Sequence, residues 1–264
     1  MPKQKIYQVD AFTDQLFAGN PAAVCPLSEW LPDEQMQKIA NENNLAETAF
    51  VVPKGEDFFI RWFTPTDEVA LCGHATLASA FVFYEELGYD KPAIRFHSVE
   101  SGVLTVSRAD GKLFLDFPVD VLVPALESPE LIAEKIGVQP SEVLRGKTDL
   151  VAFIDTEESL RKLQPDITAI SKLGGRGLIV TAKGDEVDFV SRFFAPQVGV
   201  GEDSVTGSAH TSLIPLWADK LSKTEMTARQ LSQRGGQLWC ELRGDRCIIG
   251  GHARLYLVGE INLE

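Results

Sequence analysis

Two short segments of the chain combine glycine with residues that can bind an anion or move a proton. The first is Cys72-Gly73-His74-Ala75, and the second is Asp203-Ser204-Val205-Thr206-Gly207-Ser208. Each leads into an apolar stretch that predicts a buried helix. Backbone N–H groups at the start of a helix are unpaired and carry the positive end of its dipole, so they attract anions. We therefore expect both segments to bind a carboxylate, aided by the hydroxyls of Thr206 and Ser208.

An internal duplication relates these two segments. Aligning Gly73 with Gly207 gives an offset of 134 residues, and Arg61-Trp62-Phe63-Thr64-Pro65 matches Arg192-Phe193-Phe194-Ala195-Pro196 at an offset of 131. A period of half the chain favours two domains over a solenoid, whose repeats are about 20–50 residues long. We predict domains at 1–118 and 119–264, with residues 254–263 able to return as a strand to the N-terminal half.

The elements that must position these segments follow from hydrophobic pattern and turn residues. Leu31-Pro32-Asp33-Glu34 predicts the start of a helix whose inward stripe is Met36, Ile39 and Ala40. Asp110-Gly111 predicts a hairpin. The second half repeats the plan, with a helix over 165–173, and 118–147 connects the halves. The predicted fold is α+β, with two pseudo-repeated domains whose strands wrap around one buried helix each.

Composition excludes several classes of protein. The 264 residues carry a net charge of −13, which argues against a nucleic acid or an anionic membrane surface as partner. No apolar run reaches the roughly 18 residues of a membrane-spanning helix, and the N-terminus lacks a signal peptide pattern. The four cysteines fall in no zinc-binding spacing. We expect a reduced, cytoplasmic protein without a bound metal.

Four motifs, in this order along the chain, resemble the phenazine-biosynthesis isomerase-like (PhzF-like) family. They are Gly19-Asn20-Pro21-Ala22-Ala23-Val24, Ala46-Glu47-Thr48-Ala49-Phe50, Leu71-Cys72-Gly73-His74-Ala75-Thr76 and the segment from Gly201 to Ala209. The resemblance covers essentially the whole chain. It implies a diaminopimelate epimerase-like fold, an active site in a cleft between the two halves, and a homodimer.

The resemblance also implies a role for individual residues. Glu47 would be the general acid/base, and burial in a cleft would raise its pKa toward working pH. His74 and Asp203 would line the site and relay protons, and the Asn20 amide would bind substrate. Glu47 and Asp203 have no acidic counterpart in the other half, so the fold does not require them. The structural alternatives are a solvated Glu47, an Asp203 or Ser204 that caps a helix, and a His74 bonded to backbone.

We expect a cofactor-independent isomerase that moves a proton between carbons of a small carboxylate-bearing substrate, cyclic or amino-acid-like. Its substrate contacts would be Asn20 and the backbone of Gly73, Ala75, Thr206, Gly207 and Ser208. The first alternative is an amino-acid epimerase in which Cys72 is a second base. Because the position matching Cys72 holds Thr206, a poor base, we expect Cys72 to be a packed residue instead. The second alternative is a small-anion-binding protein without turnover.

Overall fold

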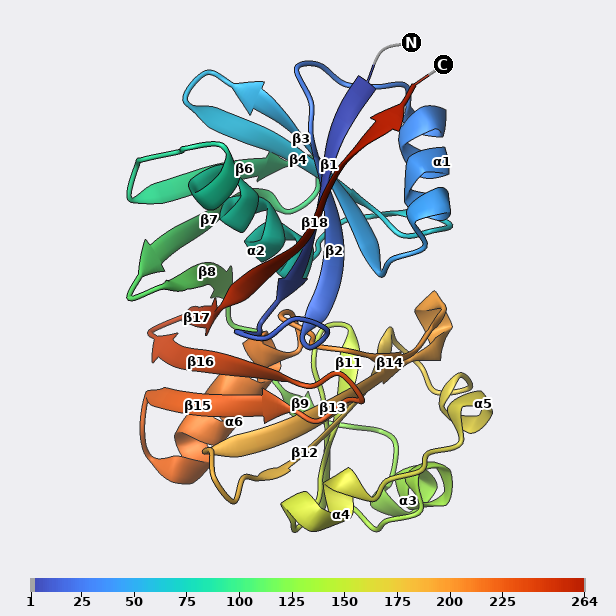
Figure 1. The fold of residues 1–264 in the computed structure, drawn as a ribbon. Helices are drawn as coiled ribbons and strands as arrows, with labels where there is room; N and C mark the ends of the chain where they lie inside the picture. Colours follow the sequence, from blue (N-terminus) through green and yellow to red (C-terminus); the bar gives the residue numbers. More distant parts are fainter. Residues whose placement is uncertain (1–2, 264) are drawn as a thin grey trace. The chain divides into compact units, whose positions relative to one another are not determined.

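The computed structural model describes residues 3–263, which divide into two compact units. Unit 1 contains the described residues up to Asp116 and those from Gly250 onward, and unit 2 is Phe117–Ile249. Both units mix strands and helices, so the protein is α+β, as the sequence predicted (Figure 1). Over the described range, no helix has the length and apolar character needed to cross a membrane.

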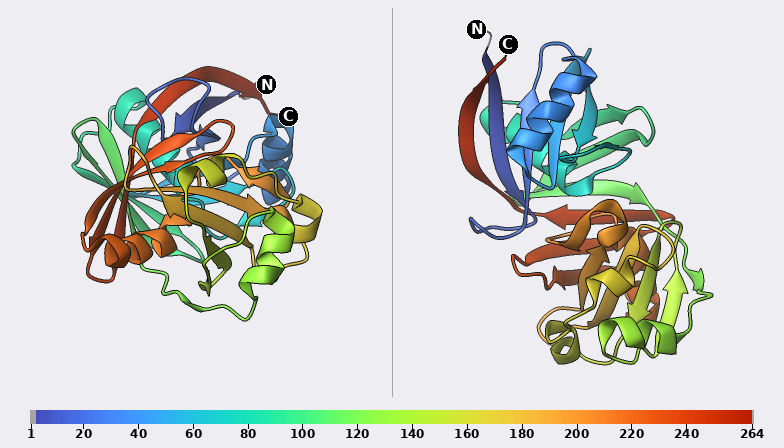
Figure 2. Two further views of the ribbon diagram at one scale, coloured as in Figure 1. Left: turned by 90° about the horizontal axis from the view of Figure 1, so that it is seen from below. Right: turned by 90° about the vertical axis from the view of Figure 1, so that its right-hand side faces the viewer.

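Unit 1 is a mixed sheet with one buried helix, α2. Its strands follow the order β18, β1, β2, β3, β4, β6, β7, β8, with β2–β3 and β4–β6 parallel and the other neighbours antiparallel. Figure 2 shows β18 and β1 side by side. The elements are β1 (Lys3–Ala11), β2 (Asn20–Pro26), α1 (Asp33–Asn43), β3 (Glu47–Lys54), β4 (Asp57–Phe63), β5 (Glu68–Val69), α2 (Gly73–Phe81), the π-helical turn η1 (Val82–Glu86), β6 (Ala93–Ser98), β7 (Gly102–Ala109), β8 (Lys112–Pro118) and β18 (Ala253–Asn262).

The two helices of unit 1 bury the faces that their sequences predict. In α1, Met36 and Ala40 are buried, and Ile39 packs against the same core. In α2, every residue from 73 to 80 is buried. Polar side chains within this apolar helix bond back to its own carbonyls: Thr76 Oγ1 donates to Cys72 O at 2.5 Å and Ser79 Oγ to Ala75 O at 2.7 Å. Burial of these hydroxyls therefore leaves no donor unpaired.

Unit 2 contains a second mixed sheet and the helix α6. Its strands follow the order β9, β10, β11, β12, β13, β15, β16, with β11–β12 and β13–β15 parallel. The elements are β9 (Val123–Pro124), α3 (Pro129–Ile136), β10 (Glu142–Arg145), β11 (Asp149–Phe153), α4 (Glu157–Arg161), α5 (Ile167–Ile170), β12 (Gly177–Lys183), β13 (Phe189–Ala195), the 3₁₀ turn η2 (Pro196–Val198), β14 (Val200–Asp203), α6 (His210–Leu221), β15 (Glu225–Gln230), β16 (Gly236–Arg243) and β17 (Arg246–Gly251).

The helices of unit 2 differ from the sequence prediction in their limits. The helix predicted over 165–173 is only the single turn α5, which begins after its cap, Asp166, whose carboxylate accepts from Ala169 N–H. The stretch 118–147, predicted as a connection, holds α3 and two strands. The helix α6 begins at His210, after a turn at 207–209, whereas α2 begins directly at Gly73.

Pro215 interrupts the hydrogen bonds of α6. Proline has no N–H, so the Thr211 carbonyl four residues earlier loses its helical donor. That carbonyl accepts instead from the backbone N–H of Asp120 at 3.2 Å and from the Cys247 thiol at 3.5 Å. The Asp120 carboxylate also accepts from Ser212 Oγ at 2.8 Å. Asp120 therefore holds the first half of α6 in place.

Candidate functional site

In unit 1, His74 lies at the centre of a cluster of side chains that could transfer protons. Its Nε2 atom lies 3.0 Å from Glu47 Oε2, and its Nδ1 atom lies 3.2 Å from Asn20 Nδ2 and 3.5 Å from Cys72 Sγ. Asn20 begins β2 and Glu47 begins β3, and these strands are parallel with Ala22 opposite Glu47. Both strands therefore start beside the first turn of α2, which carries His74.

The contact with Asn20 fixes the tautomer of His74 when its ring is neutral. An amide NH₂ only donates, so Nδ1 of the neutral ring accepts from Asn20 and Nε2 carries the hydrogen. Nε2 and Glu47 Oε2 lie within ion-pair distance but are not aligned as a hydrogen bond. Glu47 thus lies beside the imidazole ring, with 18% of its side chain exposed, and the His74 side chain is 6% exposed. Both structural alternatives for these residues are wrong, because Glu47 is not a solvated acid and His74 contacts side chains rather than backbone.

Burial and neighbouring charges shift the pKa values in this cluster. Burial raises the pKa of Cys72 to about 11, and the charge of Glu47 acts in the same direction. Burial by itself would lower the pKa of His74, but the contacts with Cys72 and Glu47 outweigh it and hold that pKa well above its ordinary value. With Cys72 protonated at neutral pH, Glu47 is the negative partner of His74.

The same three side chains are also the types that bind metals. One potential ligand atom each from Glu47, Cys72 and His74 lies within 4.8 Å of the others. However, Cys72 approaches Nδ1 and Glu47 approaches Nε2, on opposite sides of the imidazole ring. These two contacts would allow proton transfer through the ring, and the same three side chains are close enough to share one ion.

In unit 2, Asp203 and Thr206 belong to a closed network with Gln230. Thr206 Oγ1 donates to Asp203 Oδ2 at 2.5 Å, and Thr206 N–H donates to Gln230 Oε1 at 2.8 Å. The Gln230 amide donates to Asp203 O at 2.9 Å and to Thr206 Oγ1 at 3.1 Å. The expectation that the Thr206 hydroxyl binds the substrate is therefore wrong, because its hydrogen is committed to Asp203. Its role is to hold that carboxylate.

Neither predicted cap is present at the start of α6. The residue before the helix is Ala209, and no side chain caps it. Asp203 is instead held by Thr206, and the Ser204 carbonyl accepts from Ser232 Oγ at 2.7 Å. Since the cap reading of Asp203 is wrong, its carboxylate has a different role.

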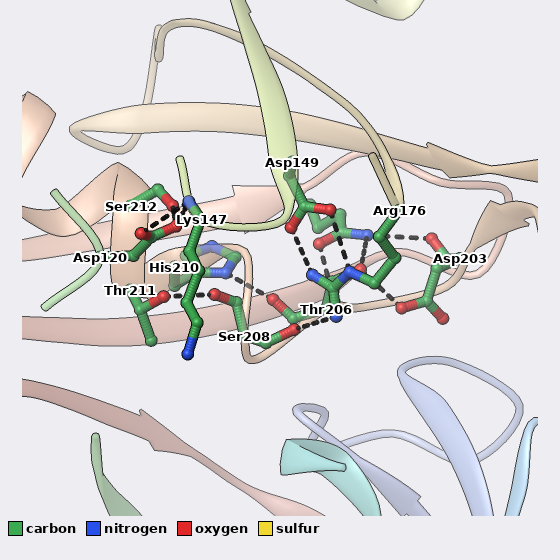
Figure 3. A network of polar contacts seen from close by, with 11 residues as sticks. Asp120, Lys147, Asp149, Arg176, Asp203, Thr206, Ser208, His210, Thr211 and Ser212 are labelled. Carbon is green, nitrogen blue, oxygen red and sulfur yellow. Dashed lines mark hydrogen bonds and ion pairs between the residues drawn. The ribbon is translucent and has the colours of Figure 1, made fainter. Parts of the chain in front are cut away.

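A second network of unit 2 joins Arg176 to Ser208 (Figure 3). The Arg176 guanidinium donates from Nε to Asp149 Oδ1 at 2.9 Å and from Nη2 to Asp149 Oδ2 at 2.5 Å. Its third nitrogen, Nη1, donates to Ser208 Oγ at 3.0 Å. Asp149 is buried, with 3% of its side chain exposed. Ser208 belongs to the turn that precedes α6, so this ion pair is attached to the predicted carboxylate-binding segment.

His210 is the other buried titratable group near this turn. Its Nδ1 atom lies 2.8 Å from the Thr206 carbonyl, and its ring packs against Phe189. Burial lowers the pKa of His210 to about 4. The side chain is therefore neutral at pH 7 and fixes the turn through the Thr206 carbonyl.

The structure brings the predicted residues together in two groups, one in each unit. Asn20, Glu47 and His74, with the backbone of Gly73 and Ala75, form the group in unit 1. Asp203, Thr206, Gly207 and Ser208 form the group in unit 2. Sequence reasoning missed Asp149, Arg176 and Gln230, which support the second group. Arg176 follows Gly174-Gly175 at a strand start, which is the only local signal it has.

A groove of about 760 Å³ also lies in unit 1, at the hairpin between β7 and β8. Arg108, Lys112 and Arg254 line it, opposite Asp14, Glu85 and Asp110. None of the predicted site residues lies along it. The chemistry of the Glu47 cluster, rather than the shape of this groove, therefore identifies the candidate site.

Comparison with known proteins identifies the family of this chain. The family model described as phenazine biosynthesis-like protein (PhzC-PhzF) matches residues 9–259. The chain belongs to the PhzC-PhzF family. An uncharacterized isomerase of Pseudomonas aeruginosa is 52% identical over 98% of this chain and 99% of its own length. The prediction that the chain belongs to this family, and that it is an isomerase, is thus confirmed.

Solved structures extend the comparison to the fold. A PhzF family protein of Enterococcus faecalis matches with a TM-score of 0.94 and 44% identity, covering 99% of this chain and all of the other. A probable proline racemase of Agrobacterium radiobacter, solved with bound carbonate, matches with a TM-score of 0.63 and 11% identity, covering 99% of this chain and 93% of its own. This PhzC-PhzF protein therefore shares its fold with racemases as well as with its own family.

Proposed function

We propose that this chain is a cofactor-independent isomerase with Glu47 as its general acid/base. It moves a proton between two carbons of a small carboxylate-bearing substrate, cyclic or amino-acid-like. The observation that carries the proposal is the contact of 3.0 Å between Glu47 Oε2 and His74 Nε2, with the ring oriented by Asn20. A carboxylate beside a buried, oriented imidazole is a base whose position is set before the substrate binds.

The reaction proceeds in two proton transfers. Glu47 takes a proton from an sp³ carbon; the C–H bond breaks, a carboxyl O–H bond forms, and the electron pair moves across an adjacent C=C bond. The protonated Glu47 then returns the proton to the far carbon of that system. His74, 3.0 Å away, stabilises the carboxylate form of Glu47 before the first transfer and after the second, and forms no bond to the substrate. One base acting on one face is sufficient for this chemistry.

We propose that the groups of unit 2 bind a substrate carboxylate. Asp203, fixed by Thr206 and Gln230, is a polar group that orients it. The backbone N–H groups of Gly207 and Ser208, at the positive end of α6, bind its carboxylate, as those of Gly73 and Ala75 do in unit 1. The acidic chain as a whole repels anions, so this binding depends on such local donors.

One observation favours amino-acid epimerisation as a second candidate function. Cys72 Sγ lies 3.5 Å from His74 Nδ1, so a thiol is joined to the same imidazole as Glu47. A two-base inversion needs a second base on the opposite face of the carbon. The pKa of Cys72, raised to about 11, keeps the thiol protonated and makes it the poorer base of the two.

Proton exchange with solvent tests this function. The protein is incubated in deuterated water with cyclic amino acids and a dihydro-hydroxyanthranilate, and deuterium at carbon is followed by NMR. An isomerase places deuterium at a second carbon, whereas an epimerase places it at the original carbon with inversion. Absence of carbon-bound deuterium from every substrate that binds would contradict both enzymes and favour an anion-binding protein.

We also propose that the two units arose by duplication and that the protein is a homodimer. Matching ladders support the duplication, since β2–β3–β4 and β11–β12–β13 each join a parallel pair to an antiparallel one. The strand β18 supports the dimer, because it exposes Tyr256, Leu257 and Val258 beside Phe17. Antiparallel pairing of two β18 strands about Leu257 would set Arg254 of one copy against Glu260 of the other.

A further inference from the structure

Arg176 is the one side chain of unit 2 whose hydrogen bonds connect a buried ion pair with the turn before α6. Its guanidinium places two donors on Asp149 and the third on Ser208 Oγ. The Phe193 ring lies 5.1 Å from the guanidinium carbon. A planar guanidinium that is hydrogen-bonded along two edges and lies next to an aromatic ring has little rotational freedom. Arg176 is therefore a rigid support for Ser208.

The backbone around Arg176 is fixed as well. Arg176 N–H donates to the Thr148 carbonyl at 2.7 Å, and Gly175 before it adopts a φ of +94°. A Cβ atom at Gly175 would lie 2.5 Å from that same carbonyl. Only glycine lets the chain turn here without a clash, so the position of the guanidinium is set by local backbone as well as by Asp149.

The direction of the hydrogen bond to Ser208 decides what the hydroxyl can do. A guanidinium has no acceptor, so Ser208 Oγ must accept from Arg176, and its own hydrogen points elsewhere. Across residues 3–263, no protein acceptor is paired with that hydrogen, and Ser208 is partly exposed. The Ser208 hydroxyl is thus presented as a donor, in contrast to that of Thr206, which donates to Asp203.

We propose that Arg176 is a positioning residue that makes Ser208 a fixed hydrogen-bond donor for the substrate carboxylate. This inference rests on the proposed function and deepens it by assigning the selection of a carboxylate to unit 2. Arg176 does not touch the substrate. Its charge is balanced by Asp149, and it acts through the hydroxyl that it orients and polarises.

Paired ligands measure this selection without depending on turnover. Benzoate and 3-hydroxyanthranilate are each compared with the corresponding carboxamide by calorimetric titration of the full chain. Neither acid has a proton on an sp³ carbon, so binding is separated from chemistry. The wild type is expected to bind each carboxylate more tightly than its amide. Ser208→Ala is expected to reduce that preference about tenfold, and Ser208→Thr, which keeps the hydroxyl, to restore most of it.

A double-mutant cycle distinguishes positioning from a structural role. Asp149→Asn/Arg176→Gln replaces the ion pair by a neutral pair and avoids a buried lone charge. It should reduce the carboxylate preference about as much as Ser208→Ala does, and should have no further effect in the Ser208→Ala background. Arg176→Lys keeps the positive charge but loses the planar guanidinium, so its carboxylate preference should lie between those of the wild type and the double variant. The exposed pair Arg229–Glu186, 2.6 Å apart, provides the control Glu186→Gln/Arg229→Gln, which should leave the preference unchanged.

Two results would overturn the inference, and they have different meanings. If the wild type prefers carboxylates but the Arg176 variants keep that preference, or add to the loss in the Ser208→Ala background, Arg176 does not act through Ser208 and the proposed function stands. If the wild type shows no preference for a carboxylate in either pair, the proposed anchoring itself fails, and this inference fails with it.

Discussion

Asn20 Nδ2 lies 3.2 Å from His74 Nδ1, on the side of the imidazole ring opposite Glu47. In the neutral ring, this contact places the hydrogen on Nε2, the nitrogen nearer to Glu47. Asn20 is 1% exposed, so water does not compete for the nitrogen. A buried amide thus sets the tautomer that the proposed base requires.

Reversing that hydrogen bond should slow the reaction. Asn20→Asp supplies an acceptor, draws the hydrogen of His74 to Nδ1, and in the neutral tautomer leaves Nε2 without a donor for Glu47. We expect kcat for carbon-bound exchange to fall about 100-fold with a small change in KM, since a wrong tautomer damages catalysis more than binding. NMR of the imidazole nitrogens reports the tautomer directly. Asn41→Asp, at an exposed site of α1, is the control; an Asn20→Asp enzyme with wild-type kcat would show that the tautomer is irrelevant.

His210 should make the folded state sensitive to acid. Its pKa is about 4 in the folded protein against 6.5 for an unperturbed histidine, so between these values the unfolded chain binds a proton that the folded chain does not. The free energy of unfolding therefore falls as the pH is lowered through this window, by about 3 kcal/mol in total at roughly 1.4 kcal/mol per unit of pKa shift. Urea unfolding at pH 7, 5.5 and 4.5 measures it.

The matched variant for this measurement is His210→Gln, which keeps an amide donor for the Thr206 carbonyl but does not titrate. The difference between wild type and His210→Gln isolates the histidine from the carboxylates that also titrate in acid. The pH dependence should be shallower in the variant. Identical slopes for the two proteins would mean that His210 is not a buried neutral group.

Pro215→Ala tests whether Asp120 replaces the missing helical donor at Thr211. Proline inside a helix ordinarily costs about 3 kcal/mol relative to alanine. Here the Thr211 carbonyl already accepts from Asp120 N–H, and an alanine N–H would compete for the same oxygen. We expect the free energy of unfolding to rise by less than about 1 kcal/mol. A gain near the full 3 kcal/mol would indicate that the Asp120 contact contributes nothing.

If the protein is a dimer that pairs through β18, substitutions at the exposed side chains of β18 should convert it to a monomer. Tyr256→Lys/Val258→Lys places like charges where two copies would meet, so sedimentation should show a monomer in place of a dimer. Both side chains are exposed within unit 1, so the thermal unfolding of the variant should remain close to that of the wild type. A wild-type protein that sediments as a monomer at micromolar concentration would contradict the dimer.

Local sequence signals predicted the elements that depend on neighbours along the chain. The stripe of Met36 and Ala40 in α1 is such a case. So is the hairpin at Asp110-Gly111, where both residues have positive φ. Each rests on a helical period or a turn preference that a few residues determine.

Features set by distant residues could not be predicted in this way. The sequence alone predicts that the Thr206 hydroxyl binds the substrate. In the structure, β15 pairs in parallel with β13, with Gln230 opposite Ser191. That pairing brings the Gln230 amide to Thr206, 24 residues away along the chain. The pairing of Arg176 with Asp149 likewise depends on the parallel register of β11 and β12. No local pattern encodes either register.

The role of Glu47 as the proton-transferring base is tested most directly by Glu47→Gln. The substitution keeps the size and hydrogen-bonding capacity of the side chain but removes its basicity, and Glu42→Gln, at an exposed site of α1, is the control. We expect carbon-bound deuterium exchange to fall about 1,000-fold while carboxylate binding is retained, in keeping with the loss of a general base. Exchange by Glu47→Gln within a few-fold of the wild type would contradict the proposed mechanism.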